Sequence, residues 1–88
     1  MDQDGKLRIL LDLTESLGIE VRRAPARGAG WDLEGGSLVR LGDKEMFFLD
    51  DGAPTDAQIN AVAAALAGRR EIEQMFLPPE IREIIDRA

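Results

Sequence analysis

The chain has 88 residues, of which 44% are hydrophobic and 32% are charged, so its length and composition fit one globular domain spanning residues 1–88. It contains no histidine, cysteine or tyrosine. These absences exclude disulfide bonds, thiolate and histidine nucleophiles, and the ligand sets of most zinc, haem and iron–sulfur sites. The net charge of −6 disfavours general binding to nucleic acid, which depends on cations that neutralise phosphates.

The ends and apolar runs of the sequence bear on its location in the cell. The first four residues, Met1-Asp2-Gln3-Asp4, are acidic where a secretory signal is basic. The longest apolar run, residues 61–67, is far shorter than the ~20 residues that a membrane-spanning helix needs. We therefore expect a cytoplasmic protein that does not enter a membrane.

The first third of the chain predicts a helix, a strand and a long loop. Residues 6–17 have the spacing of an amphipathic helix, with Asp4 as its N-cap and Gly18 as its stop. Residues 19–23 alternate apolar and charged side chains, as a half-buried strand does. Residues 24–36 contain one proline and four glycines with no periodicity, which indicates a loop.

The next two strands, residues 37–41 and 44–50, are predicted to form a hairpin around a two-residue type II′ turn at Gly42-Asp43. Both faces of this hairpin carry large apolar side chains, so we expect it to be central in the sheet or to be covered on both faces, at least in part. The turn sets a register with three cross-strand pairs: Arg40 with Glu45, Val39 with Met46, and Leu38 with Phe47.

Three helices are predicted to follow the hairpin. The first begins at Thr55, which forms a capping box with Gln58, and ends at Gly68. Residues 70–76 form a short amphipathic stretch, and Pro78-Pro79 must interrupt any helix there. The last helix, residues 80–87, carries three isoleucines on one face and, on its exposed side, two charge pairs at i, i+4 spacing: Arg82 with Asp86, and Glu83 with Arg87.

The resulting order, α-β-β-β-α-α-α, predicts an α+β fold in which a small three-stranded antiparallel sheet packs against helices.

The adjacent carboxylates at the end of the hairpin are a candidate metal site. Asp50 and Asp51, with Glu45 on the same strand, could hold magnesium, which prefers oxygen ligands. Acidic residues followed by Gly52 are, however, also typical of a strand-to-helix turn. We favour the turn, and therefore predict no catalytic residue, no metal site and no cofactor.

Three arginines and the only tryptophan lie in or beside the long loop. This half of the chain has nearly equal numbers of acidic and basic residues. Residues 1–44 carry eight acidic and seven basic side chains, whereas residues 45–88 carry nine and four. Arginine and tryptophan on a loop are typical of a protein-contact hot spot. Two alternatives remain: the same side chains stack on a single-stranded base, which the acidic net charge disfavours, or the tryptophan closes over the core and the arginines pair with nearby acids. The residues concerned are Arg22, Arg23, Arg27 and Trp31.

A second candidate surface is the apolar triplet Met75-Phe76-Leu77. A core built on three strands has limited room for all three side chains, and surplus apolar surface on a small protein usually marks a partner or a dimer contact. The alternative is that the triplet packs the last helix onto the sheet. The predicted partner is another protein or a second copy of the chain.

Three segments carry a resemblance to known proteins: residues 13–23, residues 34–41 and residues 77–82. They resemble short stand-alone bacterial proteins with no assigned function. The resemblance also extends to small accessory factors of bacterial signalling and polarity systems, including regulators of Ras-like motility GTPases. It implies no particular site.

Three functions remain after these observations. The first is a non-catalytic interaction module, either an adaptor or a regulator. The second is a regulator of a nucleotide-binding partner such as a Ras-like GTPase, and the third is a magnesium-dependent carboxylate enzyme. We expect the first, which is not an enzyme.

Overall fold

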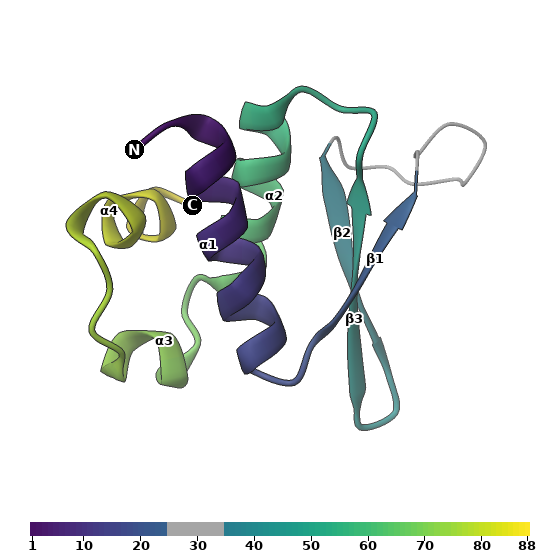
Figure 1. Ribbon diagram of the computed structural model, residues 1–88. Helices are drawn as coiled ribbons and strands as arrows, with labels where there is room; N and C mark the ends of the chain where they lie inside the picture. The colour runs from purple at the N-terminus through teal and green to yellow at the C-terminus, as the bar shows by residue number, and fades with distance from the viewer. Residues whose placement is uncertain (25–34) are drawn as a thin grey trace.

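The computed structural model describes residues 1–24 and 35–88. Arg27 and Trp31 therefore lie outside the described residues. Figure 1 shows a three-stranded sheet with all the described helices on one side of it. The elements are α1 (Gln3–Ser16), β1 (Glu20–Ala24), β2 (Gly36–Leu41), β3 (Lys44–Asp50), α2 (Thr55–Leu66), α3 (Arg70–Gln74) and α4 (Pro79–Arg87). The predicted α+β fold and the predicted order of elements are confirmed.

The sheet is mixed, whereas the sequence predicted an antiparallel one. Its strand order is β1-β3-β2, so the last strand lies in the centre and pairs in parallel with β1. The two outer strands are two strand spacings apart, about 10 Å. The eleven residues between β1 and β2 are more than enough to reach across that separation. A long connection therefore allows the hairpin to insert β3 beside β1.

The hairpin has the predicted register, with Arg40 opposite Glu45 and Leu38 opposite Phe47. Gly42 has φ +65°, and no described residue other than glycine has a positive φ, so the turn has the predicted type II′ geometry. Of the two alternatives for the hairpin, the central position applies to β3. The described helices lie on one side of the sheet, and Val39 and Leu41 lie on the other face, where Leu41 is 59% exposed.

Two of the predicted helix caps are also wrong. α1 begins at Gln3, and its N-cap is Asp2, whose Oδ1 accepts a hydrogen bond of 2.7 Å from the backbone N–H of Gly5. At α2 the N-cap is Pro54, so Thr55 is already helical and no capping box forms. Gln58 is instead buried, and its Nε2 donates to the carbonyl oxygen of Ala53 at 2.8 Å.

The core has two parts, because α1 and α2 pack on the sheet and α4 packs on the other side of these two helices. Phe47 and Leu49 of the central strand are both almost fully buried, and α4 contributes Ile81 and Ile85. The other buried hydrophobic residues are Leu10, Leu11, Ile19, Ile59, Val62, Ala63, Leu66 and Ile72. In the described part of the chain, no helix combines the length and hydropathy that crossing a membrane would require.

Candidate protein-interaction surfaces

The triplet Met75-Phe76-Leu77 is divided by the backbone between α3 and α4. Met75 has φ −84° and ψ 145°, so the chain is extended there and successive side chains point in opposite directions. Met75 and Leu77 are partly buried against the core, whereas Phe76 is 100% exposed. Met75 and Leu77 therefore pack against the core, although α4 contacts α1 and α2 and not the sheet, and Phe76 is the one residue of the triplet left fully exposed.

The segment that carries Phe76 is fixed at both ends. The guanidinium of Arg82 on α4 donates to the carbonyl oxygen of Met75 at 2.5 Å. On the other side, Pro78-Pro79 restricts the backbone and starts α4. The sequence missed this role of Arg82, for which it predicted a pair with Asp86. The contact to Met75 depends on how α3 and α4 pack, so no local spacing indicates it.

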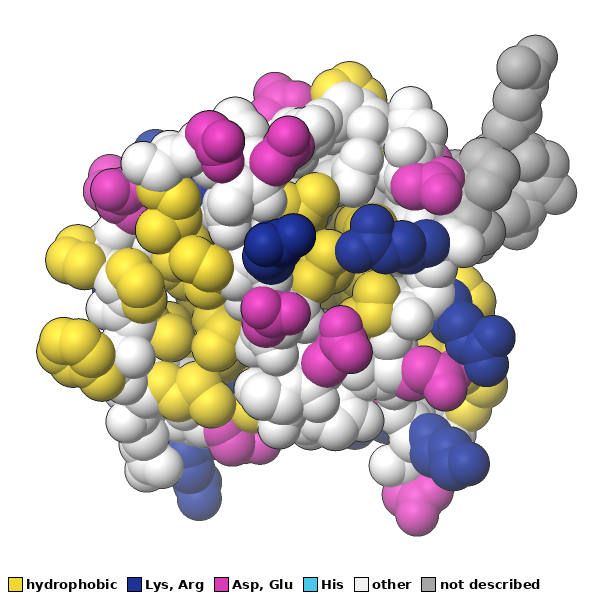
Figure 2. All heavy atoms as spheres, viewed as in Figure 1, with side chains coloured by type: hydrophobic (Ala, Val, Ile, Leu, Met, Phe, Trp, Pro, Cys, Tyr) yellow, Lys and Arg dark blue, Asp and Glu magenta, His cyan; other side chains and the backbone are white. Residues whose placement is uncertain are grey.

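The segment between α3 and α4, which carries Phe76, lies on an apolar side of the molecule. In Figure 2 hydrophobic side chains gather on the side of the molecule formed by α1, α3 and α4, at the left of the view. The N-terminal amine of Met1 lies 3.9 Å from Glu80 at the start of α4, and Met1 is 55% exposed. We call the exposed ring of Phe76, together with the exposed parts of Met1, Met75 and Leu77, the Phe76 surface.

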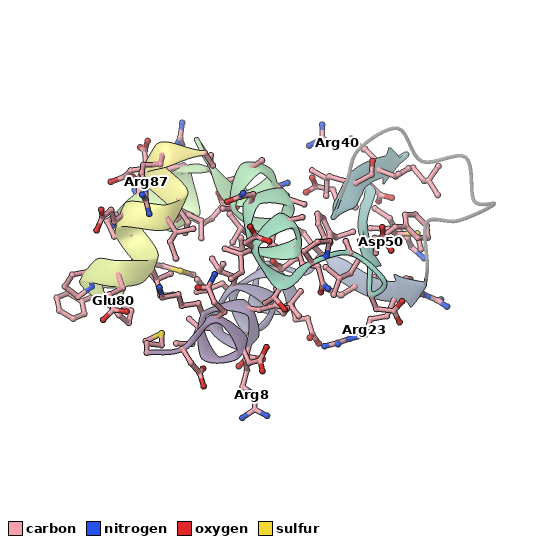
Figure 3. The ribbon with its side chains drawn as sticks, turned by 90° about the horizontal axis from the view of Figure 1, so that it is seen from above. Arg8, Arg23, Arg40, Asp50, Glu80 and Arg87 are labelled. Carbon is pink, nitrogen blue, oxygen red and sulfur yellow. The ribbon has the colours of Figure 1, made fainter. Side chains whose placement is uncertain are left out.

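The predicted arginine site is not assembled among the described residues. Arg22 lies on the face of the sheet that the helices leave open, and its Nε donates to Glu20 at 2.8 Å. Arg23 is the next residue of β1 and points to the opposite face, where it lines a groove of about 330 Å³ with Arg8 and Asp12 of α1. Figure 3 shows Arg8 and Arg23 on the same side of the molecule. The two arginines therefore serve different surfaces.

The candidate magnesium site is also divided between two faces. Asp50 Oδ1 accepts from the backbone N–H of Gly52 at 3.1 Å, which is the geometry of the strand-to-helix turn. Glu45 lies on the opposite face of β3, because odd- and even-numbered residues of a strand alternate. Among the described residues, no group of three acidic side chains could hold a metal ion.

Glu45 is instead the centre of an ion-pair cluster. The two terminal nitrogens of Arg69 donate to its two carboxylate oxygens at 3.1 and 2.6 Å, and Arg40 approaches to 3.5 Å. Arg69 Nε also donates to the carbonyl oxygen of Ala65 in the last turn of α2. The hydrogen bond from Arg69 lowers the pKa of Glu45, and the same bond raises the pKa of Arg69. This cluster ties the end of α2 to the central strand.

Two further grooves differ in polarity. One, of about 580 Å³, lies between α1, α2 and α4 and mixes charges of both signs, including Lys6, Asp56 and Arg87. The other, of about 460 Å³, lies between β2 and α2. All its lining residues are uncharged: Gly36, Ser37, Leu38, Phe47, Asn60, Ala61, Ala64 and Ala65.

Comparisons of the chain with protein-family models, curated proteins and solved structures find no match. The resemblance to bacterial accessory factors therefore stays a prediction.

Proposed function

We propose that the chain is a non-catalytic interaction module that binds another protein through the Phe76 surface. The observation that carries the proposal is the complete exposure of Phe76 on a segment fixed by Arg82 and two prolines. Burying a phenylalanine side chain is worth about 1.5–3 kcal/mol. A restrained segment also loses little conformational freedom on binding, which favours its use as an anchor.

The side chains around Phe76 suggest the chemistry of the partner. Glu73 on α3 and Glu80 on α4 flank the triplet, and both are exposed. A partner with an apolar pocket bordered by lysine or arginine would bury the ring and meet these carboxylates at its rim. Such rim charges act mainly on the rate of association and on specificity.

The described carboxylates favour this proposal over a magnesium-dependent enzyme. Glu45, the carboxyl group with a lowered pKa, already accepts two hydrogen bonds from Arg69. Asp50 accepts a bond within its own turn and lies on the other face of the strand. These contacts give both carboxylates structural roles.

The proposal is tested by affinity capture from an extract of the source cells with three forms of the chain. These are the wild type, Phe76→Ser and, as a matched control, Leu41→Ser, which removes another exposed apolar side chain at the far side of the molecule. We expect a partner that the wild type and Leu41→Ser retain and Phe76→Ser loses. With that partner purified, Phe76→Ser should weaken binding at least tenfold, about 1.4 kcal/mol.

Phe76→Ser should leave the melting temperature unchanged, because the ring makes no buried contact. If every retained protein binds all three forms equally, the Phe76 surface is not the binding site and the proposal is wrong.

A further inference from the structure

The outer edge of β2 has backbone groups available for another strand. The N–H of Asp50 donates to the carbonyl oxygen of Gly35 at 3.0 Å, which makes these two residues a hydrogen-bonded pair. Hydrogen bonding alternates along antiparallel strands, so Gly36, Leu38 and Arg40 direct their N–H and C=O groups away from β3. In the described part of the chain, no strand pairs with this edge.

β2 lacks the features that usually protect an edge strand. Natural sheets protect their edges with charges, prolines or bulges. The opposite edge, β1, has three charged residues in five, and two of them, Glu20 and Arg22, form an ion pair along the strand. β2 has one charged residue in six, Arg40, no proline and an uninterrupted register. The β2 edge is therefore less protected than the β1 edge against pairing with a strand of another chain.

An apolar groove lies along this unprotected edge. It is the groove of about 460 Å³ between β2 and α2, and its helix wall is made of three alanines and Asn60. Leu38 lies at its strand wall and is 36% exposed. A strand added beside β2 would place alternate side chains in this groove, where the short alanine side chains leave room for them.

We propose that the occupant is β2 of a second copy of the chain, paired antiparallel about a two-fold axis at Leu38 to give a six-stranded sheet. In this register Arg40 lies opposite Gly36 of the partner subunit, so its long side chain meets no side chain there. An axis at Arg40 would bring two guanidinium groups together, and an axis at Gly36 would leave Arg40 outside the paired segment. Among the axes that pass through a residue with outward N–H and C=O groups, charge and length therefore select the axis at Leu38.

The contact is self-complementary in the way that a two-fold interface requires. The groove that receives Leu38 of the partner subunit is lined only by uncharged residues. Although each copy has a net charge of −6, the two copies therefore bring no acidic side chains together in the groove. The repulsion that remains acts between charges outside the contact, where salt screens it. Dimerisation should therefore strengthen when the salt concentration is raised.

Sedimentation equilibrium of the full chain tests the proposal, from about 10 µM to about 1 mM, the range in which a weak dimer forms. We expect the average mass of the wild type to rise toward twice the monomer mass. Leu38→Asp should weaken the dimer at least tenfold. The matched control Leu41→Asp makes the same change of charge on the same strand, but on the opposite face, and should shift the dissociation constant by less than threefold.

A second variant, Leu38→Pro, addresses the backbone directly. It removes an N–H that does not bond to β3, so a folded but monomeric protein is expected. Circular dichroism and a melting curve establish that each variant is folded. A wild type that stays monomeric over the whole range overturns the proposal, and so do equal effects of Leu38→Asp and Leu41→Asp.

The dimer and the Phe76 surface are tested separately. Phe76→Ser should not change the dissociation constant of the dimer, and Leu38→Asp should not abolish the Phe76-dependent capture. If another protein's strand occupies the groove instead, the purified wild type is monomeric and the proposal of a second copy is wrong.

Discussion

Glu45 shows how a charged residue in a strand can serve the fold instead of a reaction. Its side chain and that of Arg69 are each only 19% exposed, and the two meet through paired hydrogen bonds. Hydrogen bonds to charged groups contribute about 1.5–3 kcal/mol to stability. Removing Arg69 would also leave the Glu45 carboxylate partly buried with Arg40 as its remaining partner at a longer distance.

We therefore expect Arg69→Met to lower the free energy of unfolding by about 1.5–3 kcal/mol. Chemical denaturation measures this loss. Arg70→Met is the matched control, because Arg70 is exposed and makes no contact with Glu45. A loss of equal size in both variants would show that the Glu45–Arg69 pair does not stabilise the fold.

The same pair predicts how stability depends on pH. The pKa of Glu45 is lowered in the folded protein, so its contribution is present above the unfolded value of about 4.5 and is lost as the pH falls through the lowered folded pKa. In Glu45→Gln this titration is absent. The difference in unfolding free energy between wild type and Glu45→Gln should therefore be constant near neutral pH and shrink below pH 4.5. A difference that does not change with pH would contradict the prediction.

At position 35, the packing of the chain against α2 leaves no room for a side chain larger than that of glycine. Its φ is +95°, and a Cβ there would lie 2.2 Å from the carbonyl oxygen of Ala57 on α2. Gly18 has a similar φ of +83° but nothing within 4 Å of an added Cβ. We expect Gly18→Ala to cost about 1–2 kcal/mol from the backbone alone. Gly35→Ala should cost clearly more, because β2 and α2 must separate. Equal costs in thermal or chemical unfolding would contradict this explanation.

α4 is short, and its stability depends on the core that it covers. Ile81 is fully buried and Ile85 is 3% exposed, whereas nine residues are too few to form a helix alone. Each isoleucine contributes about 1.5–3 kcal/mol by burial, a large share of the ~5–15 kcal/mol that a small domain usually has. We expect deletion of residues 78–88 to abolish cooperative unfolding.

Calorimetry or circular dichroism on heating checks this expectation, with Glu83→Ala on the exposed side of α4 as the control. A truncated chain that retains a sharp, nearly native transition would show that α4 is not part of the core. α4 would then be a segment that binds a partner, and the binding surface proposed around Phe76 would include α4.

The two proposed contacts occupy different parts of the molecule. The Phe76 surface lies at the α3–α4 end, whereas β2 is an outer strand of the sheet, which lies on the other side of α1 and α2 (Figure 1). Figure 3 likewise shows Glu80 and Arg40 well apart. A dimer through β2 would therefore leave both Phe76 surfaces available to partners. Such a dimer would bind a partner that has two sites more tightly than the monomer does, through a higher effective concentration.

The sequence by itself determined the type and order of the elements and the register of the hairpin. These features depend on local periodicity, on the turn at Gly42 and on the prolines before α4, which act over a few residues. It also indicated Phe76, the most exposed large hydrophobic residue described, since Phe76 lies in a triplet for which a small core has limited room. The order of the strands depends on long-range pairing, which no local pattern contains.

Only the tertiary structure decided how the candidate residues are grouped. Arg22 and Arg23 adjoin in the sequence yet point to opposite faces, and Glu45 and Asp50 share a strand yet lie on opposite faces. Alternation along a strand separates such neighbours, but which face is covered depends on where the helices pack. The contacts of Arg69 with Glu45 and of Arg82 with Met75 arise from the same packing. The unprotected edge of β2 exists because β1 pairs with β3 and leaves β2 outermost.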